Sequence, residues 1–234
     1  MQVPAGEMLA LDSGLTRLEW RRSARARRVS LRIDPRAGII VVTLPPRAAR
    51  QAGMSLLMDH LDWINARLAA LPGAISFTDG ARVPVHGVEH VLRAVGGVRG
   101  TARVEGRTLL IPGDPSFFAR RTMDFLKAEA RRQLTALVAV KAAMAGVQPR
   151  RITVKDTRSR WGSCASNRNL AFSWRLVMAP TYVQDYVAAH EVAHLRHMNH
   201  GPDFWALVAE LSPMPDIAIE WLRTQGPRLL RIGA

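Results

Sequence analysis

The sequence predicts an α+β fold, with a β-rich N-terminal module followed by a helical half that carries a small β-hairpin or sheet. Up to about residue 113, apolar and polar residues mostly alternate, which is the period of a half-buried strand. Beyond that point apolar residues recur every three or four positions, the period of an amphipathic helix. A third observation is a cluster of histidines on one of the expected helices. We therefore expect two domains, residues 1–113 and residues 114–234.

The N-terminal module is expected to begin with strands in residues 16–44. Apolar residues alternate with polar ones on both sides of a turn at 34–38, which contains Pro and Gly. Residues 47–70 have apolar side chains at helical spacing and are expected to be helical. Short strands separated by turns are expected next, at 74–78, 82–86, 89–95, 101–104 and 107–111. The Pro- and Gly-rich stretch 111–115 predicts a linker between the two domains.

The C-terminal half is expected to begin with a long helix over residues 116–145. Strands at 152–156 and 170–175 follow, and either of them could pair with an extended substrate at a sheet edge. The turn-forming residues 166–169 indicate a hairpin, with Cys164 at its edge.

A further helix is expected to start near Pro180, because no Gly or Pro then occurs until after the histidine cluster. Asn199-His200-Gly201-Pro202 predicts a turn, since Gly and Pro interrupt helices. Another helix should begin near Pro202. Its expected buried side consists of Phe204, Leu207, Val208 and Leu211.

His190-Glu191-Val-Ala-His194 is the most informative segment of the chain. An α-helix has about 3.6 residues per turn, so imidazoles four residues apart point to the same side and can reach one metal ion. Glu191 is placed to address a metal-bound water without being a ligand. Three protein ligands and one open position are typical of a catalytic zinc site. The segment therefore predicts the zinc-binding helix of a metal-dependent hydrolase.

The third ligand is expected to be a further histidine. Four of the seven histidines lie between residues 190 and 200, which favours a metal site over ordinary surface or core histidines. His200 is preferred because a turn can bring it to the metal from a separate direction, as a tetrahedral site requires. His197 is the competing choice. The remaining histidines are expected to be structural: His60, His86 and His90.

The stretch from His190 to Trp205 resembles the zinc helix of the YgjP-like metallopeptidase family, which is related to SprT-like and WLM-type proteases. Upstream, the Trp161-Gly-Ser-Cys164 element and the strand leading to Ala179-Pro180 are similar to elements of that family. The arginine-rich segment 21–33 is similar to its opening strands. The resemblance extends from about Arg21 to Trp221.

This resemblance implies a zincin-like, gluzincin-type fold for the C-terminal domain. It implies that His190, His194 and His200 bind Zn²⁺ and that Glu191 is the catalytic base. Zinc would then activate a water for attack on a peptide carbonyl while Glu191 accepts the proton. Buried tyrosine and arginine side chains often serve as hydrogen-bond anchors. Despite this structural alternative, three further residues are candidates to contact the substrate or its oxyanion: Tyr186, Arg158 and Trp161.

Cys164 is the only cysteine, so no intramolecular disulfide can form. It is open to three interpretations: a core residue, a redox-sensitive thiol, or an additional soft ligand. The chain has no run of apolar residues long enough for a membrane span and no visible secretory signal. With a single cysteine, we expect a cytoplasmic protein.

The charge is the second strong observation. The formal net charge is +14, and ten arginines lie between Arg17 and Arg50 against two acidic residues, Glu19 and Asp34. Arginine-rich faces bind phosphates, so sequence-independent contact with nucleic acid is one expectation. An acidic protein partner, or an ordinary solvated surface in an arginine-rich protein, would account for the same composition.

Three functions are therefore compatible with the sequence. The first is a zinc metallopeptidase acting on a protein or peptide substrate. The second is a metal-dependent hydrolase of a small amide. The third is a basic nucleic-acid-binding protein with an inactive zinc site, although a purely structural site has no use for Glu191 beside the metal.

Overall fold

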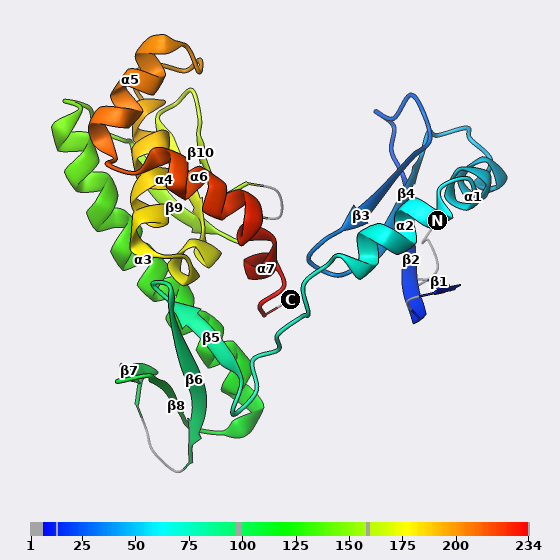
Figure 1. Ribbon diagram of the computed structural model, residues 1–234, viewed down its shortest axis with the longest axis horizontal. Coiled ribbons are helices and arrows are strands. Elements are labelled where there is room, and N and C mark those ends of the chain that lie inside the picture. The colour runs from blue at the N-terminus through cyan, green and yellow to red at the C-terminus, as the bar shows by residue number, and fades with distance from the viewer. Residues whose placement is uncertain (1–6, 13, 97–99, 158–159, 234) are drawn as a thin grey trace. The chain divides into compact units, whose positions relative to one another are not determined.

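The computed structural model describes residues 7–12, 14–96, 100–157 and 160–233 (Figure 1). The α+β class is confirmed, with strands concentrated in the N-terminal half and helices in the C-terminal half. The chain forms two compact units, Met1–Gly73 and Ala74–Ala234. The structural division therefore lies at Gly73 and not near residue 113. The described residues contain no helix with the length and hydropathy of a membrane span.

The first unit is a four-stranded sheet covered by two helices. Its strands have the order β1-β2-β4-β3, with the central pair β2 and β4 parallel. Side chains of the sheet and of both helices form a separate core: Leu18, Ile40, Val42, Leu44, Leu57 and Ile64. Gly53 lets α1 lie close to the sheet, because a Cβ there would overlap Trp20. The elements are β1 (Glu7–Leu11), β2 (Gly14–Arg22), β3 (Ser30–Asp34), β4 (Ile39–Leu44), α1 (Arg50–Met58) and α2 (Leu61–Ala69).

The helical expectation for residues 47–70 is confirmed over 50–58 and 61–69. The structure has two helices, separated at Asp59 and His60. His60 has non-helical backbone angles (φ −121°, ψ 20°), and its ring Nδ1 donates to the Leu56 carbonyl at 2.9 Å. A side chain that takes over a backbone acceptor competes with helical hydrogen bonding. No Gly or Pro marks this break, so the apolar spacing alone concealed it.

The second unit begins with a sheet of order β5-β6-β8-β7. Residues 74–78 are not a strand, and Ile75 makes only an isolated bridge to Ile232. The predicted linker at 111–115 is also wrong, because β8 continues to Pro112 and pairs in parallel with β6. Ile111 is buried in the same core as α3, so this sheet belongs to the second unit. The strands are β5 (Arg82–Val85), β6 (Val88–Val95), β7 (Arg103–Glu105) and β8 (Thr108–Pro112).

The long helix α3 (Phe118–Met144) confirms the prediction for residues 116–145 and packs against α4, β8 and β9. A three-stranded sheet of order β10-β11-β9 follows. Because β11 is central, it has no free edge for a substrate, contrary to the expectation for 170–175. The predicted hairpin is the antiparallel pair β10–β11, with Cys164 at the end of β10. The strands are β9 (Arg151–Lys155), β10 (Gly162–Cys164) and β11 (Asn169–Ser173).

Helices close the chain. Short 3₁₀ segments, η1 (Pro115–Phe117) and η2 (Trp174–Met178), precede α3 and α4. The predicted buried side of the helix at Pro202 is confirmed for all four residues. The remaining helices are α4 (Thr181–Ala193), α5 (Pro202–Leu211), α6 (Pro215–Thr224) and α7 (Gly226–Leu230).

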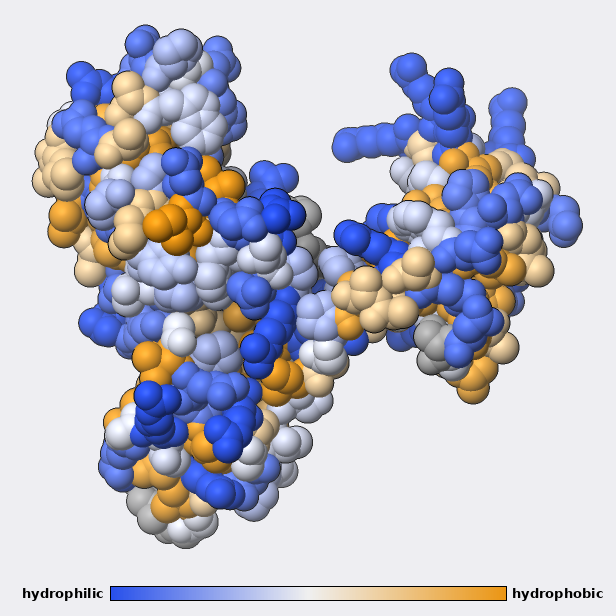
Figure 2. All heavy atoms as spheres, viewed as in Figure 1, coloured by the Kyte–Doolittle hydropathy of each residue, from blue (hydrophilic) through white to orange (hydrophobic). Residues whose placement is uncertain are grey.

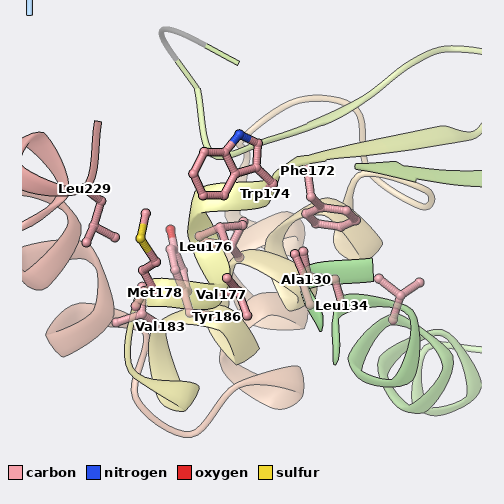
Figure 3. Close-up of a cluster of buried hydrophobic side chains, with 14 of the residues drawn as sticks. Ala130, Leu134, Phe172, Trp174, Leu176, Val177, Met178, Val183, Tyr186 and Leu229 are labelled. Atoms are coloured by element: carbon pink, nitrogen blue, oxygen red, sulfur yellow. The ribbon is translucent and has the colours of Figure 1, made fainter. Parts of the chain in front are cut away.

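The core of the second unit surrounds α4. Figure 3 shows Ala130 and Leu134 of α3 beside Phe172 of β11, with Val183 and Tyr186 of α4 in the same cluster. Nine of the thirteen residues of α4 are buried. A helix enclosed in this way holds its side chains in single rotamers, because well-packed interiors leave few alternatives.

A buried cation ties three helices together at this core. Lys141 of α3 is only 7% exposed. Its Nζ donates to the Leu211 carbonyl of α5 at 2.6 Å and pairs with Asp185 of α4, also at 2.6 Å. Both helices that flank the histidine cluster are therefore attached to one side chain.

Replacing Lys141 with Ala should destabilise the second unit. The variant leaves the Asp185 carboxylate and the Leu211 carbonyl without their buried partner, so we expect the free energy of unfolding to fall by about 3 kcal/mol. Lys127→Ala is the matched control, since Lys127 lies on the same helix but is exposed. That control should change stability by less than about 0.5 kcal/mol. Urea unfolding followed by circular dichroism measures both, and equal effects would contradict the role of Lys141.

Candidate metal centre

Three histidines meet where α4 ends and α5 begins. His190 lies in the last turn of α4, His194 is its C-cap residue, and His200 is in the turn before α5. One ring nitrogen from each lies within 4.8 Å of the others. Among the residues that the structure describes, this is the cluster of His, Cys, Asp or Glu able to hold a metal ion.

The spacing of one pair of ring nitrogens, from His190 and His200, fits a tetrahedral metal. The Nε2 atoms of His190 and His200 are 3.3 Å apart. Two nitrogens bound to tetrahedral zinc at about 2.0–2.1 Å would be about 3.3 Å from each other. The donor set therefore suits a divalent ion that prefers imidazole ligands.

Two of the imidazoles are oriented by hydrogen bonds at their other nitrogen. His194 Nδ1 donates to the backbone carbonyl of His197 at 3.1 Å, which leaves Nε2 available as a ligand atom. His190 Nδ1 lies 3.4 Å from the Tyr186 hydroxyl. The side chain of His197 is not part of the cluster, so His197 contributes its backbone and not its ring.

Burial favours the neutral form of His190 and His194. Desolvation first, and then the neighbouring His194 and His200, lower the pKa of His190 to about 4. Desolvation also lowers the pKa of His194, against the opposing effect of the His197 carbonyl. Neutral imidazole is the form that binds a metal ion.

Glu191 lies one residue beyond His190, and its side chain is buried against β10. It is only 5% exposed, and burial raises its pKa to about 7, with the charge of Arg160 acting in the opposite direction. Its Oε2 has no hydrogen-bond partner among the described residues. Gly162 of β10 is in contact with this carboxylate, since a Cβ at position 162 would overlap it.

An aromatic pair borders the three histidines. Phe204 is fully buried, and its ring centroid lies 5.0, 4.6 and 4.7 Å from those of His190, His194 and His200. Trp205 is 42% exposed and stacks on His200. Both rings come from the first turn of α5. The buried side of the site is thus lined by the apolar ring of Phe204. The low local dielectric there strengthens electrostatic interactions within the site.

The three further candidates have different surroundings. Tyr186 is nearly buried, with its hydroxyl on the Nδ1 side of His190. Trp161 is partly buried and contacts Gly226 at the start of α7. Arg158 lies outside the described residues.

Several neighbours of the site were not assigned a place there from the sequence. Phe204 was expected only as a core residue, although its position four residues after His200 was a usable signal. The contact between Gly162 and Glu191 joins residues far apart in the chain, so nothing in the local sequence indicated it. Among the acidic residues that follow the site, Asp216 is one whose charge acts on Tyr186.

Cys164 is half-buried near the site but is not a member of the metal-holding cluster. Burial, and then the charge of Glu191, raise the pKa of its thiol above the ordinary value. The thiol therefore stays protonated at neutral pH, which disfavours both metal ligation and nucleophilic reactivity.

Comparison with known proteins agrees with this geometry. The model of a family described as "YgjP-like, metallopeptidase domain" matches residues 27–225. Searches of the curated proteins and of the solved structures found no significant match. The matched region contains the histidine cluster, Glu191 and most of both structural units. The chain therefore belongs to the YgjP-like family and carries its metallopeptidase domain.

Proposed function

We propose that this metallopeptidase uses Zn²⁺, held by His190, His194 and His200, with Glu191 as its general base. The convergence of three imidazole nitrogens within 4.8 Å is the observation that carries the proposal. Three neutral nitrogen ligands leave a fourth tetrahedral position open, as catalytic zinc sites do. When bound, Zn²⁺ supplies a Lewis acid that polarises a carbonyl and lowers the pKa of water.

Glu191 accepts and then donates a proton in this mechanism. Its buried Oε2 has no partner among the described residues and accepts a proton from the water that attacks the peptide carbonyl carbon. The same carboxyl then donates that proton to the leaving amine nitrogen as the C–N bond breaks. A carboxyl enclosed by α4 and Gly162 is held in one position, which keeps both transfers short.

The Tyr186 hydroxyl and the His197 carbonyl each orient one of the proposed ligand imidazoles. Each lies at the Nδ1 of one ligand imidazole, so each orients a ring whose Nε2 faces the metal position. In this arrangement Tyr186 acts on His190 and not on the substrate. Trp161 and Arg158 remain candidates for substrate contact.

Replacing Glu191 with Gln should separate metal binding from hydrolysis. The amide has the same shape, so zinc content should be unchanged, but it cannot accept a proton. We expect cleavage of casein or a fluorogenic peptide to fall by about a hundredfold to ten-thousandfold. Glu210→Gln is the control, because Glu210 is exposed on α5. A Glu191→Gln variant with full activity would sink the proposed mechanism.

Removing one histidine should distinguish ligands from neighbours. His194→Ala should reduce bound zinc, measured by plasma mass spectrometry, to background and abolish cleavage. His197→Ala should retain both, since His197 contributes only its backbone carbonyl. Zinc should also restore activity to chelator-treated protein. Retention of zinc by His194→Ala, or its loss from His197→Ala, would show that the ligands are assigned wrongly.

We further propose that the first unit binds nucleic acid by contacting the phosphate groups of the nucleic acid. Arg25, Arg27 and Arg28 lie between β2 and β3 and are exposed. None of the three makes an ion pair with a described residue, whereas Arg21 pairs with Glu19 at 2.7 Å. Figure 2 shows long hydrophilic side chains extending from this unit. Unpaired guanidinium groups are available for bidentate contacts with phosphate.

Arg25→Gln/Arg27→Gln/Arg28→Gln should weaken binding of single-stranded DNA, measured by fluorescence anisotropy. Three lost phosphate contacts should reduce the slope of log affinity against log salt by about 2. The control removes the same charge from arginines paired with carboxylates, as Arg93→Gln/Arg103→Gln/Arg223→Gln. If the control weakens binding equally, net charge and not this segment is responsible.

A further inference from the structure

The three histidines of the proposed metal site, on which this inference rests, differ in how their rings are held. His190 and His194 are partly buried and each has a partner at Nδ1. His200 is exposed, lies in a turn outside any helix, and has no Nδ1 partner among the described residues. A ligand on a mobile side chain loses more rotamer freedom when it binds, so the site needs another means of holding His200.

Trp205 provides the missing contact. The ring centroids of His200 and Trp205 are 5.8 Å apart with an interplanar angle of 30°, a stacked arrangement. Phe204 meets His200 edge-on from a different direction, at 4.7 Å and 81°. Stacked and edge-to-face pairs at these separations are favourable geometries for aromatic rings. The His200 imidazole is thus confined between two rings of α5.

A backbone hydrogen bond fixes the position of Trp205 relative to His200. The Trp205 amide donates to the Gly201 carbonyl at 3.2 Å, which closes the first turn of α5 directly after His200. Trp205 is itself braced by Phe204, at 5.1 Å and 85°. At its other end, α5 is attached to α3 through the bond from Lys141 to Leu211. The indole is therefore a fixed surface against which the imidazole can rest.

We infer that Trp205 is the positioning residue of His200, and that indole stacking replaces the hydrogen bond that orients each of the other two ligands. Trp205 needs no polar atom for this role, only a flat face. Because its side chain is 42% exposed, its removal opens no core cavity. Loss of Trp205 should therefore lower metal affinity without unfolding the protein, which distinguishes positioning from structural support.

Three variants of the full chain test the inference. Trp205→Leu keeps an apolar side chain but removes the flat ring, whereas Trp205→Phe keeps a ring. Trp63→Leu is the matched control, since Trp63 is similarly exposed (47%) but belongs to the first unit. Zinc affinity is measured by competition with a chromophoric chelator, and the melting temperature of the metal-free protein checks folding.

We expect Trp205→Leu to bind zinc about tenfold to a hundredfold more weakly, as when other ligand-orienting groups are removed. Trp205→Phe and Trp63→Leu should bind nearly as wild type, and all melting temperatures should be similar. Equal zinc affinity of Trp205→Leu and wild type would overturn the inference and leave the proposed site intact. So would equal losses in Trp205→Leu and Trp205→Phe. A wild-type chain that binds no zinc would overturn the proposed site and the inference together.

A second measurement needs no metal. In the metal-free protein, the His200 ring protons should show an upfield ring-current shift in NMR spectra, assigned with His200→Gln. Trp205→Leu should reduce that shift, because the ring current of the indole is lost while the Phe204 ring remains. An unshifted His200 in the wild-type protein would overturn the inference whatever the metal experiments show.

Discussion

The candidate site depends on the burial of α4. This helix is enclosed by α3, α5, α6 and the β10 edge of the small sheet, so its polar side chains leave water when the unit folds. Desolvation is the first cause of both large pKa shifts at the site, downward for His190 and upward for Glu191. One physical effect, burial, thus favours neutral His190 and disfavours the charged form of the carboxyl beside it.

Burying the polar groups of such a site costs free energy unless another interaction offsets it. Glu191 leaves a buried oxygen without a partner among the described residues, and an unsatisfied polar atom of this kind costs free energy. Three imidazole nitrogens and a neighbouring carboxyl oxygen would together complement a divalent cation and its water. The residues that look unfavourable in isolation would therefore form a coherent set around one ion, as proposed above.

The support of the three proposed ligands is uneven, because they belong to different kinds of element. His190 and His194 belong to a helix fixed by the core, where the neighbouring turn supplies a hydroxyl and a carbonyl. His200 belongs to a turn, so its restraint has to come from the next helix, through Phe204 and Trp205. Lys141 joins α4 and α5 through α3, which keeps the two sources of ligands in a constant relation.

Local patterns in the sequence determined most elements and the identity of the central residues. The four-residue spacing of His190 and His194 requires only a helix, and α3, α4 and α5 are each revealed by apolar periodicity. What the sequence could not decide were contacts between distant segments. Gly162 against Glu191, the Lys141 bonds and the attachment of the β5–β8 sheet to the second unit arise from packing, which local pattern does not encode. The helix break at His60 was missed for a related reason, because a side chain there replaces a backbone bond without Gly or Pro. Spacing along the chain therefore determined which groups could share one face, and only the tertiary structure decided which partners desolvate and orient them.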